Sequence, residues 1–325
     1  MASQVLRFPT SGRVRLRTAR IIDHGSVTVS APPPSATRQP SSPSRPPGPL
    51  GDFLRARREA LTPERAGVHS YGRRRVQGLR REEVAQIAGV SVAYYTRLEQ
   101  GTATTASVPI LEALARALLL TDDERTHLLA LAGPRHASRR RPRRAEHATP
   151  AASQVLAAVD EVPAILFGRR NDVLGWNRSG HALFAGHLPF EAPDDPAARP
   201  NFPRMVFLDP HVRGVFREWR DEASRVVAGL RFLAGAAVDD PAFAELVGEL
   251  SLSSPEFAAL WSRQGVVKCS SGTKLLRHPQ VGDLDVDFQV MELLEADGQR
   301  MVLYTAPPGS SSAHALALLR ATTDA

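Results

Sequence analysis

Apolar residues recur at helical spacing in two short neighbouring stretches of the chain, 81–88 and 92–100. The first stretch ends at Gly89, and glycine commonly ends a helix because it adopts positive φ without steric cost. On the second stretch Tyr95 and Leu98 fall on one face, while small, polar and basic residues fall on the other. Two short helices joined by a tight turn predict a helix-turn-helix.

The same spacing predicts further helices around this pair, over 50–61, 108–118 and 121–132. The third of these begins with Thr-Asp-Asp-Glu, a capping box in which the first and fourth residues satisfy each other's backbone amides. Gly133 and a following proline end it. Five short helices therefore make up a predicted all-α DNA-binding domain over residues 50–133.

The outer face of the 92–100 helix suits the reading of base pairs, because a helix in the major groove must present small or hydrogen-bonding side chains. We predict that its base contacts come from Val92, Ala93, Tyr94, Thr96 and Arg97. Phosphate contacts are predicted for the basic and polar residues that flank the helix pair, namely Arg73, Arg74, Arg75, Arg80, Arg81 and Gln100.

In the second half of the chain, some stretches have apolar residues at helical spacing and others alternate apolar and polar residues as strands do. Strands are predicted over 164–167, 173–177, 274–278, 283–290 and 301–305, with strict alternation of apolar and polar residues in the fourth. Between the early and late strands the helical spacing predicts one long helix over 211–234 and shorter ones around it. Helices between two groups of strands predict an α+β domain.

Charge is distributed unevenly along the 325 residues. The first 150 hold 25 Arg and 12 Asp or Glu, a net of +13, and the rest holds 16 basic and 22 acidic residues, a net of −6. A basic half followed by an acidic half indicates a polyanion-binding module joined to a different kind of domain. The single cysteine, Cys269, excludes an internal disulfide and fits a reducing cytoplasm, which is the predicted location.

Composition also divides the chain into four predicted parts. Residues 1–49 are a disordered extension, since 31–49 are rich in proline and serine. The DNA-binding domain, 50–133, is followed by a basic linker, 134–151, and by a ligand-binding or dimerisation domain, 152–325. We find no apolar run long enough to span a membrane and no secretory signal at the N-terminus.

The run EEVAQIAGVSVAYYTRLEQG resembles the helix-turn-helix of the lambda-repressor-like, Xre-type regulators. More widely, residues 50–133 resemble the N-terminal half of the actinobacterial MmyB-like regulators. The second half resembles the same family at FGRRNDVLGWNRS, FPRMVFLDP, LVGELSLSSPEFAALW, SGTKLLRHPQVGDLDVDF and MVLYTAPPGSSS. The resemblance covers most of residues 50–321. Gln77 stands where the family usually has proline.

The resemblance implies a PAS-like domain that holds a fatty-acid-like or other apolar ligand, and a homodimer that reads a palindromic site in double-stranded DNA. Arginine or histidine side chains could anchor the carboxylate of such a ligand, and aromatic residues could line its pocket. The pocket candidates are Arg169, Arg170, Trp176, Arg204, Phe207, Trp219, Trp261, His278 and Tyr304.

Candidates for other chemistry are weak. Asp283, Asp285 and Asp287 lack the glycine and glutamate that a calcium loop needs, so they are expected to form the wet face of a strand. We find no nucleophile elbow, paired metal-binding histidines or phosphate-binding glycine loop. The sequence therefore predicts no enzyme, cofactor or metal. Two alternatives remain: a constitutive repressor whose second half only dimerises, and a DNA-tethered acyl hydrolase.

Overall fold

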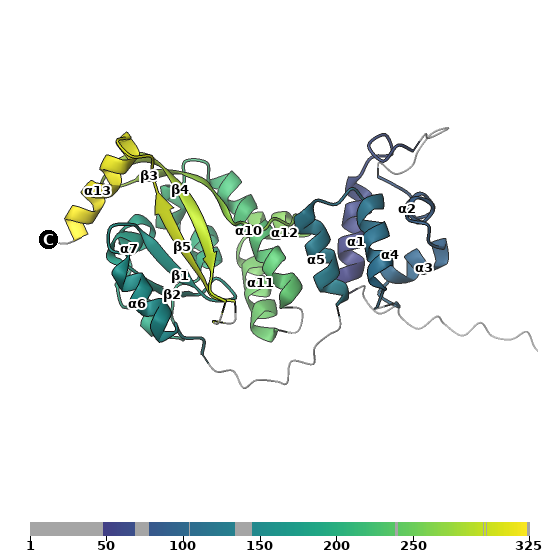
Figure 1. Ribbon diagram of the computed structural model, residues 1–325, viewed down its shortest axis with the longest axis horizontal. Coiled ribbons are helices and arrows are strands. Elements are labelled where there is room, and N and C mark those ends of the chain that lie inside the picture. Colours follow the sequence, from purple (N-terminus) through teal and green to yellow (C-terminus); the bar gives the residue numbers. More distant parts are fainter. Residues whose placement is uncertain are drawn as a thin grey trace, which may run out of the picture. The chain divides into compact units, whose positions relative to one another are not determined.

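The computed structural model describes residues 48–68, 78–103, 105–133, 145–237, 240–294, 296 and 298–323 (Figure 1). Residues 1–47, the three arginines at 73–75 and most of the basic linker lie outside these ranges, and so do the predictions made for them. No helix among the described residues is both long enough and apolar enough to cross a membrane.

The N-terminal domain consists of the predicted helices. Their bounds are α1 Pro49–Ala60, α2 Arg81–Ala88, α3 Val92–Glu99, α4 Val108–Ala117 and α5 Asp122–Ala132. Side chains from these helices bury one another in a small common core, in which Phe53, Leu54, Val84, Tyr95 and Leu98 are fully buried. The prediction of an all-α, five-helix domain is confirmed.

Local signals fix the turn between α2 and α3. Gly89 adopts a left-handed conformation, with φ 67°, which costs glycine little because it has no Cβ. The Ser91 hydroxyl then caps α3 by accepting a hydrogen bond from the Tyr94 amide at 3.1 Å. Thr121 and Glu124 form the predicted capping box at the start of α5. Ile87, one of the apolar residues at helical spacing in the 81–88 stretch, is 44% exposed.

A glycine sets the approach of α1 to α3. A Cβ placed on Gly51 would lie 2.3 Å from the Glu99 carbonyl oxygen, which is closer than any side chain allows. The absence of a side chain therefore lets the backbones of α1 and the end of α3 touch. This contact brings the first helix close to the residues that anchor α3.

The C-terminal domain contains a five-stranded antiparallel sheet in the order β2-β1-β5-β4-β3. Its strands are β1 Ala164–Phe167, β2 Val173–Trp176, β3 Ser271–His278, β4 Gly282–Glu292 and β5 Arg300–Thr305. The helices are α6 Pro150–Ala158, α7 Arg178–Ala185, α8 Phe202–Leu208, α9 Pro210–Val215, α10 Trp219–Ala236, α11 Pro241–Ser253, α12 Pro255–Ser262 and α13 Ser311–Thr323, with a 3₁₀ turn at Ala192–Asp194. The predicted α+β class and all five strands are confirmed.

The strands alternate as the sequence predicts. Leu284, Val286 and Phe288 of β4 are buried, and the aspartates between them are exposed. In β1, Ile165 and Phe167 join the larger core, while alternate residues join a smaller core with α6.

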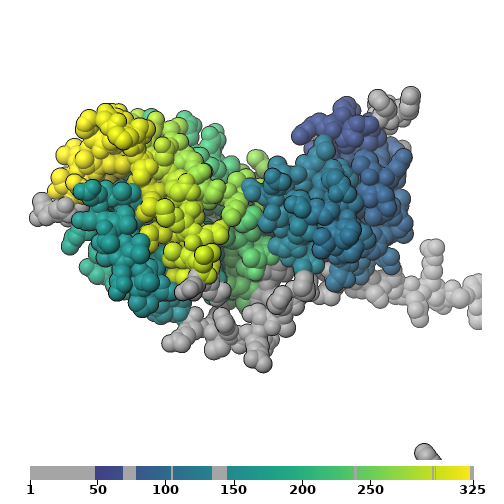
Figure 2. Space-filling model, in the orientation of Figure 1, coloured from purple at the N-terminus to yellow at the C-terminus, as the bar shows by residue number. Residues whose placement is uncertain are grey.

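Helix α13 returns to pack beside α7, so the last helix covers an early part of the domain (Figures 1 and 2).

The prediction of one long helix over 211–234 is wrong, because the chain forms two helices there, α9 and α10. It leaves α9 at Phe216, which is extended and forms a β-bridge with Leu276. The Arg217 amide donates to the Leu275 carbonyl at 2.9 Å. Apolar residues continue at helical spacing through this break. The spacing therefore gave no sign that the backbone at Phe216 pairs with β3.

Candidate nucleic-acid interface and ligand cavity

Helix α3 presents a face made of short, polar and basic side chains. Val92, Ala93 and Arg97 are exposed, and Tyr94 and Thr96 are half-buried at its edges. The Arg97 guanidinium lies 5.8 Å from the centre of the Tyr94 ring, within the range of a cation–π contact. All the residues predicted to read bases are thus at least partly accessible on one short helix.

A buried carboxylate, that of Glu99, holds α3 in place. Arg58 of α1 donates from Nε to Glu99 Oε1 at 2.5 Å, and Arg81 of α2 donates from Nε to Oε2 at 2.7 Å. Burial alone would raise the pKa of Glu99, but the two guanidinium groups outweigh burial and keep that pKa below its usual range. One acid therefore ties together the first three helices.

The residues predicted to contact phosphate differ in their surroundings. The Arg80 side chain is 47% exposed and lies 3.7 Å from the exposed Glu82 carboxylate. Gln100 is exposed at the end of α3. Arg81 is also partly exposed, but its Nε is bound to Glu99. Arg80 and Gln100 can therefore turn toward DNA more freely than Arg81.

A cavity of about 360 Å³ lies against the sheet of the C-terminal domain. The sheet contributes Phe167, Phe288 and Tyr304 to its wall, and α10 contributes Val226 and Leu230. Most of the wall is apolar, with a few polar groups among the apolar ones. Cavities of this size and character are typical of small-molecule sites.

Two buried charges of opposite sign belong to this wall. The Lys274 ammonium forms an ion pair with the Glu222 carboxylate, and both side chains are almost fully buried. The ammonium also lies 4.7 Å from the centre of the Phe288 ring. Arg225 reaches the second oxygen of the same carboxylate at 3.4 Å. The charges of Lys274 and Glu222 therefore neutralise each other where water is scarce.

Arg300, at the start of β5, is the contrasting charge in the wall. Its guanidinium donates to the Gly168 carbonyl at 3.4 Å and to the Asn171 side-chain oxygen. Burial lowers the pKa of Arg300. Among the residues that the structure describes, no carboxylate forms an ion pair with it. The guanidinium therefore donates its hydrogen bonds to neutral groups, while the Glu146 and Glu292 carboxylates act on it electrostatically from beyond ion-pair distance.

Family models match both domains. The model of the MmyB-like transcription regulator ligand binding domain matches residues 148–319, and that of a helix-turn-helix domain matches residues 49–128. The chain belongs to the MmyB-like transcription regulators. Its members are regulators and not enzymes, and this regulator has a DNA-binding helix-turn-helix domain and a ligand-binding domain. A search of curated proteins finds no matching sequence.

The regulator's cavity includes one of the predicted pocket residues, Tyr304, which is 1% exposed. Trp176 and Trp219 instead pack in the core, and each donates its indole N–H to a backbone carbonyl, at 2.8 Å and 2.9 Å respectively. Phe207 packs against Trp219 and Phe257, and Trp261 stacks on the same Phe257. These four are not among the described residues that line the cavity.

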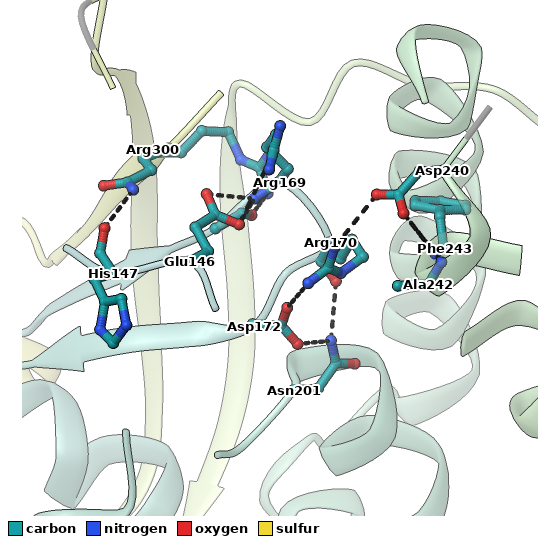
Figure 3. Close-up of polar contacts among 12 residues, drawn as sticks. Glu146, His147, Arg169, Arg170, Asp172, Asn201, Asp240, Ala242, Phe243 and Arg300 are labelled. Carbon is teal, nitrogen blue, oxygen red and sulfur yellow. Dashed lines mark hydrogen bonds and ion pairs between the residues drawn. The ribbon is translucent and has the colours of Figure 1, made fainter. Parts of the chain in front are cut away.

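The residues predicted as carboxylate anchors lie elsewhere in the domain. His278 is buried and bonds the Ala182 carbonyl at 3.0 Å, and burial lowers its pKa. Arg170 pairs with Asp172 and Asp240, each at 3.3 Å (Figure 3). Arg204 pairs with Glu249 at 2.7 Å, and it lines with Arg170 a smaller, polar recess of about 230 Å³. Arg169 packs beside Glu146.

Sequence reasoning missed Lys274, Glu222 and Arg300 as cavity residues. Lys274 had a visible signal, because it alternates with Leu276 and His278 on the buried face of β3. A charged residue in an inward position of a strand is a candidate for a polar site. Arg300 gave no such signal, because its neighbours in the cavity come from distant parts of the chain.

Within the described ranges, no three histidine, cysteine, aspartate or glutamate side chains are placed to hold a metal ion.

Proposed function

We propose that this regulator binds specific DNA sequences through α3 and that an apolar ligand in the cavity controls this binding. The exposed side of α3 supports the first part of the proposal. It places the Arg97 guanidinium, which can donate two hydrogen bonds to one base, on the same face as small side chains. Arg97 would contact a guanine, and Val92, Ala93, Tyr94 and Thr96 would complete the reading surface. Arg80, Arg81, Gln100 and the arginines at 73–75 would contact phosphates.

Replacing Arg97 tests the base-reading role. In a selection from random DNA sequences, Arg97→Ala should lose the preference for guanine at one position, a discrimination worth about 1–3 kcal/mol. Arg116→Ala, on α4 and outside the predicted contact surface, is the matched control. An unchanged binding motif for Arg97→Ala would remove Arg97 from the reading surface.

The cavity supports the ligand part of the proposal. Its apolar wall would take a hydrocarbon chain, and its charged residues would take a polar end, as in a fatty-acid-like molecule. A ligand can control DNA binding only if it binds two states of the protein unequally. Native mass spectrometry of the purified protein, before and after organic extraction, would reveal a bound apolar molecule as a discrete mass.

The regulator would act in the cytoplasm as a homodimer on a palindromic site, since a two-fold protein matches a two-fold operator. Band-shift assays on full and half sites test this, because a dimer binds the full site far more tightly than either half. The same native spectra would report the oligomeric state directly.

Two other functions remain alternatives. A constitutive repressor would carry no bound molecule and would show no thermal shift with fatty acids. A DNA-tethered acyl hydrolase would turn over acyl esters. No histidine stands among the described residues of the cavity wall to activate a nucleophile, so the regulator is favoured.

A further inference from the structure

Two residues that precede α6 are held against the ligand-binding domain by hydrogen bonds. The Glu146 carboxylate accepts from the Arg169 amide at 3.3 and 3.4 Å, and its backbone carbonyl accepts from the Arg199 guanidinium at 2.5 Å. The His147 carbonyl accepts from the Gln299 side chain at 2.8 Å. Figure 3 shows Glu146 beside Arg169, with Arg300 close by. We call Glu146 and His147 the linker clasp.

Gly168 and Asn171 shape the turn that binds Glu146. A Cβ on Gly168 would lie 2.7 Å from the Glu146 carboxylate, so a larger residue there would make this side chain shift. Asn171 adopts a positive φ of 63°, which asparagine tolerates better than most residues. The amides of Gly168 and Asn171 close the turn at 2.9 and 3.0 Å. The turn therefore positions the Arg169 amide toward Glu146.

Arg300 supports the same turn from the side of the cavity. It donates to the Gly168 carbonyl and to the Asn171 side chain, and both Asn171 and Arg300 line the cavity. The Glu146 and Glu292 carboxylates act on Arg300 without forming an ion pair with it, whereas a bound carboxylate would accept two parallel charge-assisted hydrogen bonds. An anion in the cavity would therefore compete with the turn for Arg300.

We propose that Arg300 binds the carboxylate of the fatty-acid-like ligand, and that this exchange loosens the turn at 168–172 and releases the linker clasp. This inference rests on the proposed ligand control. The clasp lies between the helix-turn-helix match, 49–128, and the first strand, so its release frees the described residues just before α6.

Calorimetry with decanoate and 1-decanol tests the anion site, because the two differ in the charge of the head group and not in chain length. The wild-type protein should bind decanoate at least tenfold more tightly than decanol. Arg300→Gln should bind both equally. Arg277→Gln is the matched control, since this arginine lies on the wet face of β3 and should leave the preference intact.

Hydrogen exchange of the segment 167–173 tests the release. Decanoate should speed exchange of the Arg169 and Asn171 amides about tenfold in the wild-type protein, and decanol should not. Glu146→Ala should exchange fast at Arg169 without ligand, yet keep its preference for decanoate. This variant also keeps the test decisive if Arg300→Gln does not fold.

Equal affinity for decanoate and decanol in the wild-type protein would overturn the inference, and so would a carboxylate preference without faster exchange. Either result would leave the proposed ligand control standing, because a ligand is still bound. Binding of neither molecule would reject the inference and the fatty-acid-like ligand together, while the DNA-binding assays would still report on the first domain.

Discussion

Both domains bury charged side chains, and two of these, Glu99 and Arg300, are left in different states. In the helix-turn-helix domain, Glu99 is enclosed by Arg58 and Arg81, and each of its oxygens accepts a charged hydrogen bond. In the ligand-binding domain, Arg300 has only neutral acceptors among the described residues. A compensated charge fixes a fold, because moving any partner is costly. A guanidinium that forms no ion pair, like that of Arg300, leaves hydrogen-bonding capacity available for an anionic ligand.

The largest expected effect tests the compensated network. Glu99→Gln removes the counter-charge of the buried Arg58 and should destabilise the N-terminal domain by about 3–5 kcal/mol. Urea denaturation, followed by hydrogen exchange in α1 and α3, measures the loss. Glu112→Gln breaks an exposed pair with Arg125 and should have no measurable effect. Similar results for both variants would contradict the structural role of Glu99.

The second test asks whether Lys274 and Glu222 in the cavity wall depend on each other for stability, as Glu99 and Arg58 do. Glu222→Leu leaves Lys274 buried without its partner and should cost about 3–5 kcal/mol. Adding Lys274→Met should restore most of this stability, because two apolar side chains leave no buried charge. A double variant as unstable as the sum of two single ones would show that the two residues act independently.

A third test uses a buried group that avoids charge by losing its proton. His127 is 3% exposed, and burial, aided by nearby guanidinium groups, lowers its pKa from 6.5 to about 4. Its neutral form contributes stability that is fully present above pH 6.5 and is lost as pH falls through 4. The loss amounts to about 3 kcal/mol.

Denaturation at several pH values between 7 and 4 measures this effect as a difference between the wild-type protein and His127→Gln. The variant should lack the part of the pH dependence that comes from His127. Parallel curves for the two proteins would show that this histidine does not titrate on unfolding.

The smallest expected effect distinguishes the roles of two neighbouring arginines, Arg80 and Arg81. Arg80→Ala should lower the slope of log affinity for DNA against log salt by about one, with little change in stability. Arg81→Ala should also weaken the Glu99 network and therefore reduce stability. Affinity measured over a range of salt concentrations, together with thermal denaturation, distinguishes the two. Equal stability of both variants would mean that the bond between Arg81 and Glu99 contributes little.

Local signals were strong enough to predict most elements. Gly89 and Ser91 marked the turn of the helix-turn-helix, and alternation along 283–290 marked both the strand and its buried face. The break at Phe216 escaped prediction, because its cause is a backbone contact with a strand about 60 residues later in the chain. Periodicity records which face is apolar, and it does not record a distant backbone partner.

The sequence alone determined that two different domains follow one another, that the first presents a reading helix, and that the second alternates strands and helices around an apolar core. These properties come from short-range patterns. Only the tertiary structure decided which charges are compensated. Arg170, Arg204 and Arg300 are the same residue type, yet only the first two form ion pairs with carboxylates from distant segments among the described residues. A counter-charge depends on distance in space, and the order of residues along the chain does not give that distance.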